Sequence, residues 1–201
     1  MVRAIVLAGG ASTRMGSPKA GLPLSDPADT FLSRLLRTLI NAGIPDIVVV
    51  TGSAREAVRA AAGRTRRPVR FEHNPKWAAG QLSSLLTGLG EHRGDLIEAA
   101  LVALVDAPLV APATVACVVE TWRQQRPLIV RPARGAEHGH PVLFDRRLFD
   151  ELRAADPARG AKTVVRAHDA DIVNVPVDDP GAFLDIDTEP EYRDLLRELR
   201  R

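Results

Sequence analysis

Short apolar runs alternate with amphipathic stretches along this chain. Residues 2–7 and 46–51 are nearly continuous apolar segments, as expected of strands buried on both faces of a sheet. Between them, leucines recur at helical spacing after Thr30, a residue type that caps helices, and the pattern stops near Gly43. This order predicts a strand, a helix and a second strand.

The same alternation continues through the rest of the chain. Further strands are predicted at residues 68–72, 100–105, 128–130, 141–144 and 172–175. Further helices are predicted at residues 54–62, 81–90, 111–125, 146–154, 161–167 and 189–200. Residues 131–140 interrupt the rhythm and are expected to form an inserted hairpin or loop. Strands separated by helices indicate a single-domain α/β fold over residues 1–201, with a mostly parallel, Rossmann-like sheet flanked by helices.

Composition narrows the class of protein. With 45% hydrophobic and 26% charged residues, the 201-residue chain resembles an ordinary soluble domain. The net charge of +2 is too small to indicate nucleic-acid binding, and the cluster of Arg64, Arg66 and Arg67 is interpreted as a solvated loop. No apolar run reaches the ~18 residues of a membrane span.

The single cysteine bears on the compartment. Cys117 lies in an apolar stretch and is predicted to be a buried thiol. One cysteine excludes a disulfide framework and a cysteine metal site, and it favours the reducing cytoplasm. The apolar run at residues 2–8 is short, contains Arg3 and leads into a glycine loop, so it is unlike a signal peptide.

A loop rich in glycine and cations follows the first strand. Residues 7–19 read Leu-Ala-Gly-Gly-Ala-Ser-Thr-Arg-Met-Gly-Ser-Pro-Lys. Ligands of open α/β sheets bind at the carboxyl ends of the strands, where Gly9 and Gly10 let backbone N–H groups approach an anion. Arg14 and Lys19 add positive charge, so the loop suits a polyanion such as a triphosphate. Neither the Gly-x-Gly-x-x-Gly dinucleotide fingerprint nor the Walker spacing is present.

This loop resembles that of the MobA-like NTP transferases, the family that includes the guanylyl- and cytidylyltransferases for molybdopterin. Further matches extend the resemblance from residue 2 to about residue 192. It implies the fold of the nucleotide-diphospho-sugar transferases and a loop that wraps the NTP phosphates. Nucleotide contacts are thereby implied for Leu7, Ala8, Gly9, Gly10, Ser12, Arg14, Gly16 and Lys19. Arg14 is expected to face the β- and γ-phosphates and Lys19 the α-phosphate.

Asp106 follows the strand predicted at residues 100–105 and should lie on the same sheet edge as the first loop. Mg²⁺ is typically held by one or two carboxylates together with substrate phosphates. The resemblance gives the aspartate of a similar Asp-x-Pro segment this role, so Asp106 is expected to bind Mg²⁺. The alternative is an aspartate that merely opens the turn before Pro108.

A second loop, within residues 74–85, leads into a predicted helix. In the relatives the corresponding glycine-serine turn lies beside the base and ribose. The resemblance therefore implies base or ribose contacts for Asn74, Gly80, Gln81 and Ser83. Ser83 and Ser84 are alternatively helix caps or anion contacts. Trp77 either packs the loop onto the body or stacks on a base.

Residues 139–144 read Gly-His-Pro-Val-Leu-Phe and resemble the cytidylyl branch most closely. There the segment lies on the acceptor side, so His140 is implied to contact or orient an acceptor phosphate. A structural histidine before proline is the alternative. Residues 159–162 (Arg-Gly-Ala-Lys) resemble a Gly-Ala-Arg turn on the acceptor side of related enzymes, with Lys162 in place of the arginine, so the resemblance is weak here.

Two carboxylates precede the last predicted helix. Residues 185–192 resemble the family's Asp-x-Asp-Thr-Pro-Glu-Asp-Tyr, with the proline one position later. Thr188 is predicted to cap the helix, with Pro190 in its first turn. A cap does not explain the two carboxylates, so Asp185 or Asp187 is expected to be a second metal contact.

Together these segments predict an Mg²⁺-dependent nucleotidyltransferase. A phosphate oxygen of a small phosphorylated acceptor, molybdopterin by resemblance, attacks the α-phosphorus of an NTP (CTP or GTP) and releases pyrophosphate. Arg14, Lys19 and Asp106 are the expected catalytic residues. One alternative is a sugar- or polyol-phosphate nucleotidyltransferase, and another is a non-catalytic nucleotide-binding module or cofactor chaperone. The loop spacing disfavours a redox dinucleotide protein.

Overall fold

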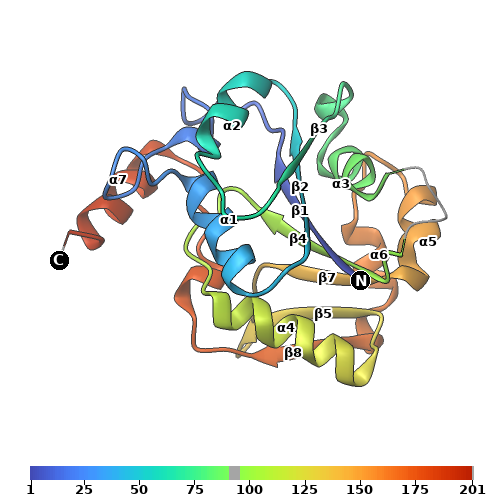
Figure 1. The fold of residues 1–201 in the computed structure, drawn as a ribbon. Coiled ribbons are helices and arrows are strands. Elements are labelled where there is room, and N and C mark those ends of the chain that lie inside the picture. Colours follow the sequence, from blue (N-terminus) through green and yellow to red (C-terminus); the bar gives the residue numbers. More distant parts are fainter. Residues whose placement is uncertain (91–95, 201) are drawn as a thin grey trace.

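The structure, a computed structural model, describes residues 1–90 and 96–200, and within them one sheet forms the centre of the molecule (Figure 1). Its strands are β1 Val2–Ala8, β2 Asp46–Thr51, β3 Arg70–His73, β4 Ala99–Leu104, β5 Ile129–Arg134, β6 Glu137–His138, β7 Val142–Asp145 and β8 Ile172–Pro176. They follow the order β3-β2-β1-β4-β7-β5-β6, with β8 paired to β5. The strand at the centre of the parallel half, β1, leads directly into the glycine loop.

The sheet has a parallel half and a mixed half. Strands β3, β2, β1 and β4 are parallel, so their carboxyl ends share one edge. Strand β7 is antiparallel to both β4 and β5, while β8 is parallel to β5. The interruption predicted at residues 131–140 is the antiparallel hairpin of β5 and β6. The expected α/β fold with a mostly parallel sheet is therefore confirmed.

Helices cover both faces of the sheet (Figure 1). They are α1 Phe31–Asn41, α2 Arg55–Ala61, α3 Gln81–Leu89, α4 Pro112–Gln125, α5 Phe149–Ala154, α6 Lys162–Ala167 and α7 Glu189–Glu198. Apolar residues of α1, α2 and α4 join one core cluster, whereas those of α3, α5 and α6 join a second. A third cluster unites the start of α1 with α7, where the rings of Phe31 and Tyr192 meet edge to face.

Local sequence explains where α1 begins and ends. The Thr30 hydroxyl accepts a hydrogen bond from the Ser33 N–H, and the Ser33 hydroxyl accepts one from the Thr30 N–H. This reciprocal cap satisfies two N–H groups that have no partner within the helix. Gly43 follows the helix with φ +79°, a left-handed conformation that glycine adopts at little cost.

Several details differ from the sequence-based expectations. Strand β3 begins at Arg70 rather than at residue 68, since Pro68 has no N–H to donate to a ladder. Strand β5 continues to Arg134 because β8 and β6 pair with its extension. Cys117 is exposed, not buried: it lies on the outer face of α4, whose inner face is formed by Val115, Val118 and other residues at helical spacing.

Two expectations concern the arginine cluster and membrane-spanning segments. Arg64, Arg66 and Arg67 are exposed, as expected of a solvated loop. Among residues 1–90 and 96–200, no helix combines the length and the apolar character that crossing a lipid bilayer requires.

Candidate active site

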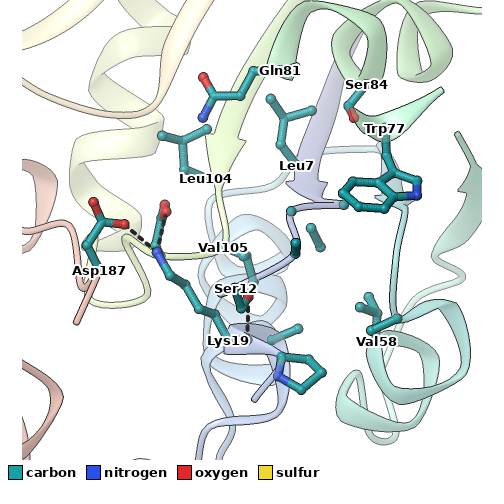
Figure 2. Close-up of a pocket in the computed structure, with 18 of the residues that line it drawn as sticks. Leu7, Ser12, Lys19, Val58, Trp77, Gln81, Ser84, Leu104, Val105 and Asp187 are labelled. Carbon is teal, nitrogen blue, oxygen red and sulfur yellow. Dashed lines mark hydrogen bonds and ion pairs between the residues drawn. The ribbon is translucent and has the colours of Figure 1, made fainter. Parts of the chain in front are cut away.

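A pocket of about 630 Å³ opens at the carboxyl ends of β1 and β4 (Figure 2). Its walls come from segments that are far apart in the sequence. They are the loop after β1, the start of α2, the turn between the 3₁₀ helix Trp77–Ala79 and α3, the end of β4, and residues 140, 162, 185 and 187. The position agrees with the rule that open α/β sheets bind ligands at this edge.

The loop after β1 is hydrogen-bonded to itself. The Ser12 hydroxyl accepts a bond from the Lys19 N–H at 3.2 Å, and the Ser12 carbonyl accepts one from the Met15 N–H at 3.0 Å. Ser12 and Gly16 have φ values of +50° and +68°. Such conformations are uncommon for serine and easy for glycine, so Gly16 serves the shape of the loop.

Gly52, which sequence reasoning did not single out, lets three loops meet beside the pocket. A methyl group built on it would lie 2.2 Å from the Gly9 carbonyl oxygen and 2.7 Å from the Cβ of Trp77. No side chain fits in that space. The loops after β1 and β2 therefore pack backbone to backbone at this point, with the Trp77 side chain against them, and the Trp77 ring stands at the rim of the pocket (Figure 2).

Four charged side chains meet at one wall of the pocket. The Lys19 Nζ donates to Asp106 Oδ2 at 3.1 Å and also to Asp187 Oδ1 (Figure 2). Arg14 Nη2 donates to the other oxygen of Asp187 at 2.9 Å. The Lys19 side chain is only 11% exposed, so these contacts are partly shielded from water. The hydrogen bond from Lys19, helped by Arg14, lowers the pKa of Asp187.

Main-chain hydrogen bonds hold Asp185 and Asp187 near Asp106. The Ile186 N–H donates to the Asp106 carbonyl and the His140 N–H donates to the Ala182 carbonyl, each at 2.8 Å. The residues on either side of Ile186 are Asp185 and Asp187, and both line the pocket. Asp106, after β4, and His140, before β7, thus hold residues 182–187 (the acidic segment) in place.

Gly181 makes this approach possible. A methyl group built there would lie 2.1 Å from the carbonyl oxygen of Leu109, closer than a real Cβ atom comes. The nearby Asp179 carboxylate accepts bonds from the Thr114 hydroxyl and the Ala111 N–H at the start of α4. The segment before the acidic pair is therefore tied to the chain that follows β4.

The local environment shifts the pKa of two pocket residues. Desolvation by the surrounding protein atoms, reinforced by the carboxylate of Asp106, raises the pKa of Asp185. Burial lowers the pKa of His140, although Asp185, Asp106 and a hydrogen bond to the Val102 backbone oppose the shift. His140 is accordingly a neutral imidazole at neutral pH.

The pocket offers oxygen ligands that suit a divalent metal ion. Asp106 Oδ1 is buried and, within the described part of the chain, has no hydrogen-bond partner. No group of three or more His, Cys, Asp or Glu side chains among residues 1–90 and 96–200 forms a closed metal cage. One or two carboxylates completed by substrate phosphates is the usual arrangement for Mg²⁺, and Asp106 with Asp187 or Asp185 fits it.

The structure brings most of the residues expected from the sequence to this pocket. Those that line it are Leu7, Ala8, Gly9, Gly10, Ser12, Arg14, Lys19, Gly80, Gln81, Asp106, His140, Asp185 and Asp187. Gly16, Asn74 and Ser83 are not among the lining residues. The buried Asn74 amide instead donates to the hydroxyls of Ser83 and Ser84 at 2.8 and 3.0 Å. These contacts brace the loop behind the pocket wall.

For some other lining residues the sequence offered only a weak indication, or none, of a place in the site. Ala54 and Val58 of α2 line the pocket, as do Leu104 and Val105 at the end of β4. The position of α2 just after β2, a neighbour of β1, is a signal for the first two. Lys162, suggested only by a weak resemblance, also lines the pocket.

Comparison with known proteins identifies a family. Residues 4–172 match the model of the MobA-like NTP transferase domain. The chain is 29% identical over 196 residues to a probable molybdenum cofactor guanylyltransferase of Mycolicibacterium paratuberculosis, an alignment that covers 96% of this chain and 94% of the relative.

Solved structures agree with that match. The crystal structure of Rv0371c from Mycobacterium tuberculosis H37Rv aligns with a TM-score of 0.81 and 28% identity, over 98% of each chain. A structure of the same protein in complex with manganese aligns with a TM-score of 0.70 over 98% of this chain and 97% of that one, again with 28% identity. Both alignments span nearly the whole chain.

Proposed function

The chain belongs to the MobA-like NTP transferase family and is a nucleotidyltransferase, and from this premise we propose that it transfers a nucleoside monophosphate, GMP first among the candidates, from an NTP to the phosphate of molybdopterin. The observation that carries the proposal is the meeting of Arg14, Lys19, Asp106 and Asp187 beside a glycine loop in one pocket. A pocket with paired cations and carboxylates suits a metal-bound triphosphate.

In the proposed reaction an acceptor phosphate oxygen attacks the α-phosphorus of the NTP. A new P–O bond forms, the bond from the α-phosphorus to the oxygen bridging to the β-phosphate breaks, and pyrophosphate leaves with the electron pair. The nucleophile is already an anion, so it requires no strong general base. The protein's contribution is therefore position and charge stabilisation.

Each charged residue has a role in this scheme. Arg14 binds the β- and γ-phosphates and stabilises the charge on departing pyrophosphate. Lys19 lies next to the α-phosphate, where charge crowds in the transition state. Gly9 and Gly10 turn backbone N–H groups towards the phosphates. The proposed roles of Gly80 and Gln81, at the start of α3, are contacts with the base or ribose.

We propose Mg²⁺ as the resident metal ion, held by Asp106 together with Asp187 or Asp185. The unpartnered oxygen of Asp106 supports a metal ion at this position, and the manganese complex of Rv0371c supports a divalent ion for a similar protein. When bound, the ion neutralises phosphate charge and orients the triphosphate. The reducing cytoplasm is the proposed compartment, consistent with a single free cysteine.

The name of the Mycolicibacterium relative supports GTP as the donor and the molybdenum cofactor as the acceptor. The Gly-His-Pro segment at residues 139–141 instead resembles the cytidylyl branch, so CTP is the second candidate donor. In either case His140 is a neutral side chain on the proposed acceptor side.

The test is pyrophosphate release from each of ATP, CTP, GTP and UTP in the presence of molybdopterin, with and without Mg²⁺. We expect release with GTP, dependent on Mg²⁺. Arg14→Ala and Lys19→Ala should each lower the rate by about 10²–10³, since a lost transition-state charge contact costs roughly 3–4 kcal/mol. Lys76→Ala, a change in an exposed residue outside the pocket, should keep the wild-type rate.

Other outcomes select among the alternatives. Release with a sugar phosphate but not with molybdopterin would assign the chain to the sugar- or polyol-phosphate enzymes. Thermal stabilisation by an NTP without turnover on any acceptor would indicate a non-catalytic nucleotide-binding module. Wild-type turnover in both the Arg14 and the Lys19 variants would refute the mechanism.

A further inference from the structure

One cation of the pocket has no partner in the part of the chain that the structure describes. Among residues 1–90 and 96–200, three lysine or arginine side chains line the pocket: Arg14, Lys19 and Lys162. The first two are ion-paired with aspartates of the pocket. Lys162 is exposed and makes no hydrogen bond or ion pair in the same part of the chain. It is therefore free to meet an anionic ligand.

Lys162 reaches the pocket from the opposite face of the sheet to Lys19. It is the first residue of α6, which is anchored by Val164 (2% exposed) in the core cluster that contains Leu82 and Leu85 of α3. Ala20, next to Lys19, belongs to the cluster on the other face. The two lysines thus enter one pocket from two layers of the fold.

The turn before α3 packs against the turn that leads to α6, beside the pocket. A methyl group built on Gly80, just before α3, would lie 3.9 Å from the carbonyl oxygen of Pro157, in the turn that leads to α6. The turn before α6 therefore lies beside the start of α3. Lys162 and Gln81 both line the pocket, and Lys162 takes no part in the ion pairs of Arg14 and Lys19.

The proposed reaction brings two anions together, and this requires cations on both sides. The triphosphate already has the glycine loop, Arg14 and Lys19. A phosphorylated acceptor that approaches the α-phosphate also approaches the carboxylates of Asp106 and Asp185, and like charges repel at such distances. Lys162 is the lining cation that remains to offset this repulsion.

We propose that Lys162 binds the acceptor's phosphate, so that the acceptor is held as a phosphate monoester on the wall formed by α3 and α6. This inference rests on the proposed function, because it assigns the second substrate of the same reaction to a subsite. Lysine suits a phosphate group, since its ammonium is a point charge on a flexible stem.

The chain offers a direct test because it contains only three lysines: Lys19, Lys76 and Lys162. The protein is saturated with GTP and Mg²⁺, and inorganic phosphate serves as the probe. Acylation of each lysine by an amine-reactive reagent is followed by mass spectrometry after cleavage at arginine, with potassium chloride at matched ionic strength as the reference. Phosphate should slow acylation of Lys162 and leave Lys76 unaffected. GTP with Mg²⁺ alone should leave Lys162 reactive.

Two results would overturn the assignment. Protection of Lys162 by GTP alone would place it in the donor site, and failure of phosphate to protect it would remove the anion subsite. Neither result depends on turnover, so failure of this proposal is distinguishable from failure of the proposed reaction, which pyrophosphate release reports.

Where the enzyme is active on molybdopterin, kinetics add a second readout. Lys162→Ala should raise the KM for the acceptor by about 10- to 100-fold, because a hydrogen bond to a charged group usually changes affinity by about that factor. The KM for the NTP should stay unchanged. Lys162→Arg should restore most of the acceptor affinity, and Lys76→Ala should match the wild type. A change confined to the NTP KM would contradict the proposal.

Discussion

Lys19 is bound by two carboxylates that the proposed metal ion would also use. In the present arrangement its ammonium lies between Asp106 and Asp187, and Arg14 adds a second positive charge at Asp187. A metal ion and Lys19 therefore compete for the same carboxylate groups, although Asp106 Oδ1 is not bonded to the lysine. When a triphosphate enters, its oxygens offer the lysine another partner, and the carboxylates become free.

This competition leads to a prediction for Lys19→Met. The variant keeps an apolar stem of similar length but removes the competing charge, so Mn²⁺ should bind in the absence of nucleotide with about tenfold higher affinity, or ~1.4 kcal/mol. Electron paramagnetic resonance of free Mn²⁺ gives the dissociation constant. Lys76→Met is the control for charge removal, and it should bind Mn²⁺ as the wild type does. Equal or weaker binding by Lys19→Met would show that the lysine does not mask the carboxylates.

At the scale of elements, the cap of α7 holds an acidic residue of the pocket. The Glu191 carboxylate accepts hydrogen bonds from the Asp187 and Thr188 N–H groups, each at 2.8 Å, and the Thr188 side chain caps the helix. Asp187 thus lies between the cap and Lys19. The helix and the proposed metal site share one stretch of backbone.

Thr188→Ala should lower the free energy of unfolding by about 1 kcal/mol, the usual cost of losing an N-cap, and should also weaken Mn²⁺ binding in the presence of nucleotide. Thr30→Ala removes the equivalent cap from α1, away from the carboxylates, and is the matched control. It should cost similar stability without changing Mn²⁺ affinity. Denaturant unfolding and Mn²⁺ titration measure the two quantities. Equal effects on binding would mean that the cap does not position Asp187.

Helices α5 and α6 are linked by His168, whose Nε2 lies 2.7 Å from a Glu151 carboxylate oxygen. The hydrogen bond to Glu151, with a further contribution from Asp171, raises the pKa of His168. Protonation is therefore more favourable in the folded than in the unfolded chain. The stabilisation is fully present below the unfolded pKa, near 6.5, and is lost as the pH rises through the raised folded value.

We accordingly expect the difference in unfolding free energy between the wild type and His168→Gln to be largest near pH 6 and to shrink as the pH rises to 9. Denaturant titrations at several pH values measure it. His138→Gln, at an exposed site on β6, is the control for the substitution itself. A difference that grew with pH would contradict the assigned ion pair.

At the scale of the whole molecule, Gly181 lies directly against the Leu109 carbonyl, and this contact holds the acidic segment against the chain after β4. Gly181→Ala places a methyl group where the Leu109 carbonyl oxygen lies, so the segment must move. The expected cost is about 1–3 kcal/mol of stability, as for other overpacked sites, together with weaker binding of NTP and Mg²⁺.

Gly21→Ala is the control for this change, because a methyl group there meets its nearest neighbour, Ala61, at an ordinary 3.9 Å. Thermal unfolding with and without GTP and Mg²⁺ reports both effects. If Gly181→Ala kept the wild-type ligand shift, the position of the segment would not matter for binding.

The sequence predicts the parts of the site that depend on one strand end each. The glycine loop directly follows β1 and Asp106 lies just after β4, so parallel pairing alone brings them to one edge. Gly52 and Lys162 depend on contacts between segments distant in sequence, which periodicity does not report. Cys117 was misassigned because apolar neighbours on a helix do not reveal which face a given position occupies.

The hydrogen bond from the Ile186 N–H to the Asp106 carbonyl has a consequence for the chain during its synthesis. Synthesis produces the glycine loop and β4 well before residues 179–187, and a domain generally folds as a unit. Until those residues are made, the chain lacks Asp185 and Asp187, including the carboxylate that pairs with Arg14. An unfinished polypeptide therefore has no complete form of the proposed metal site, and the pocket is assembled only when the last part of the chain docks.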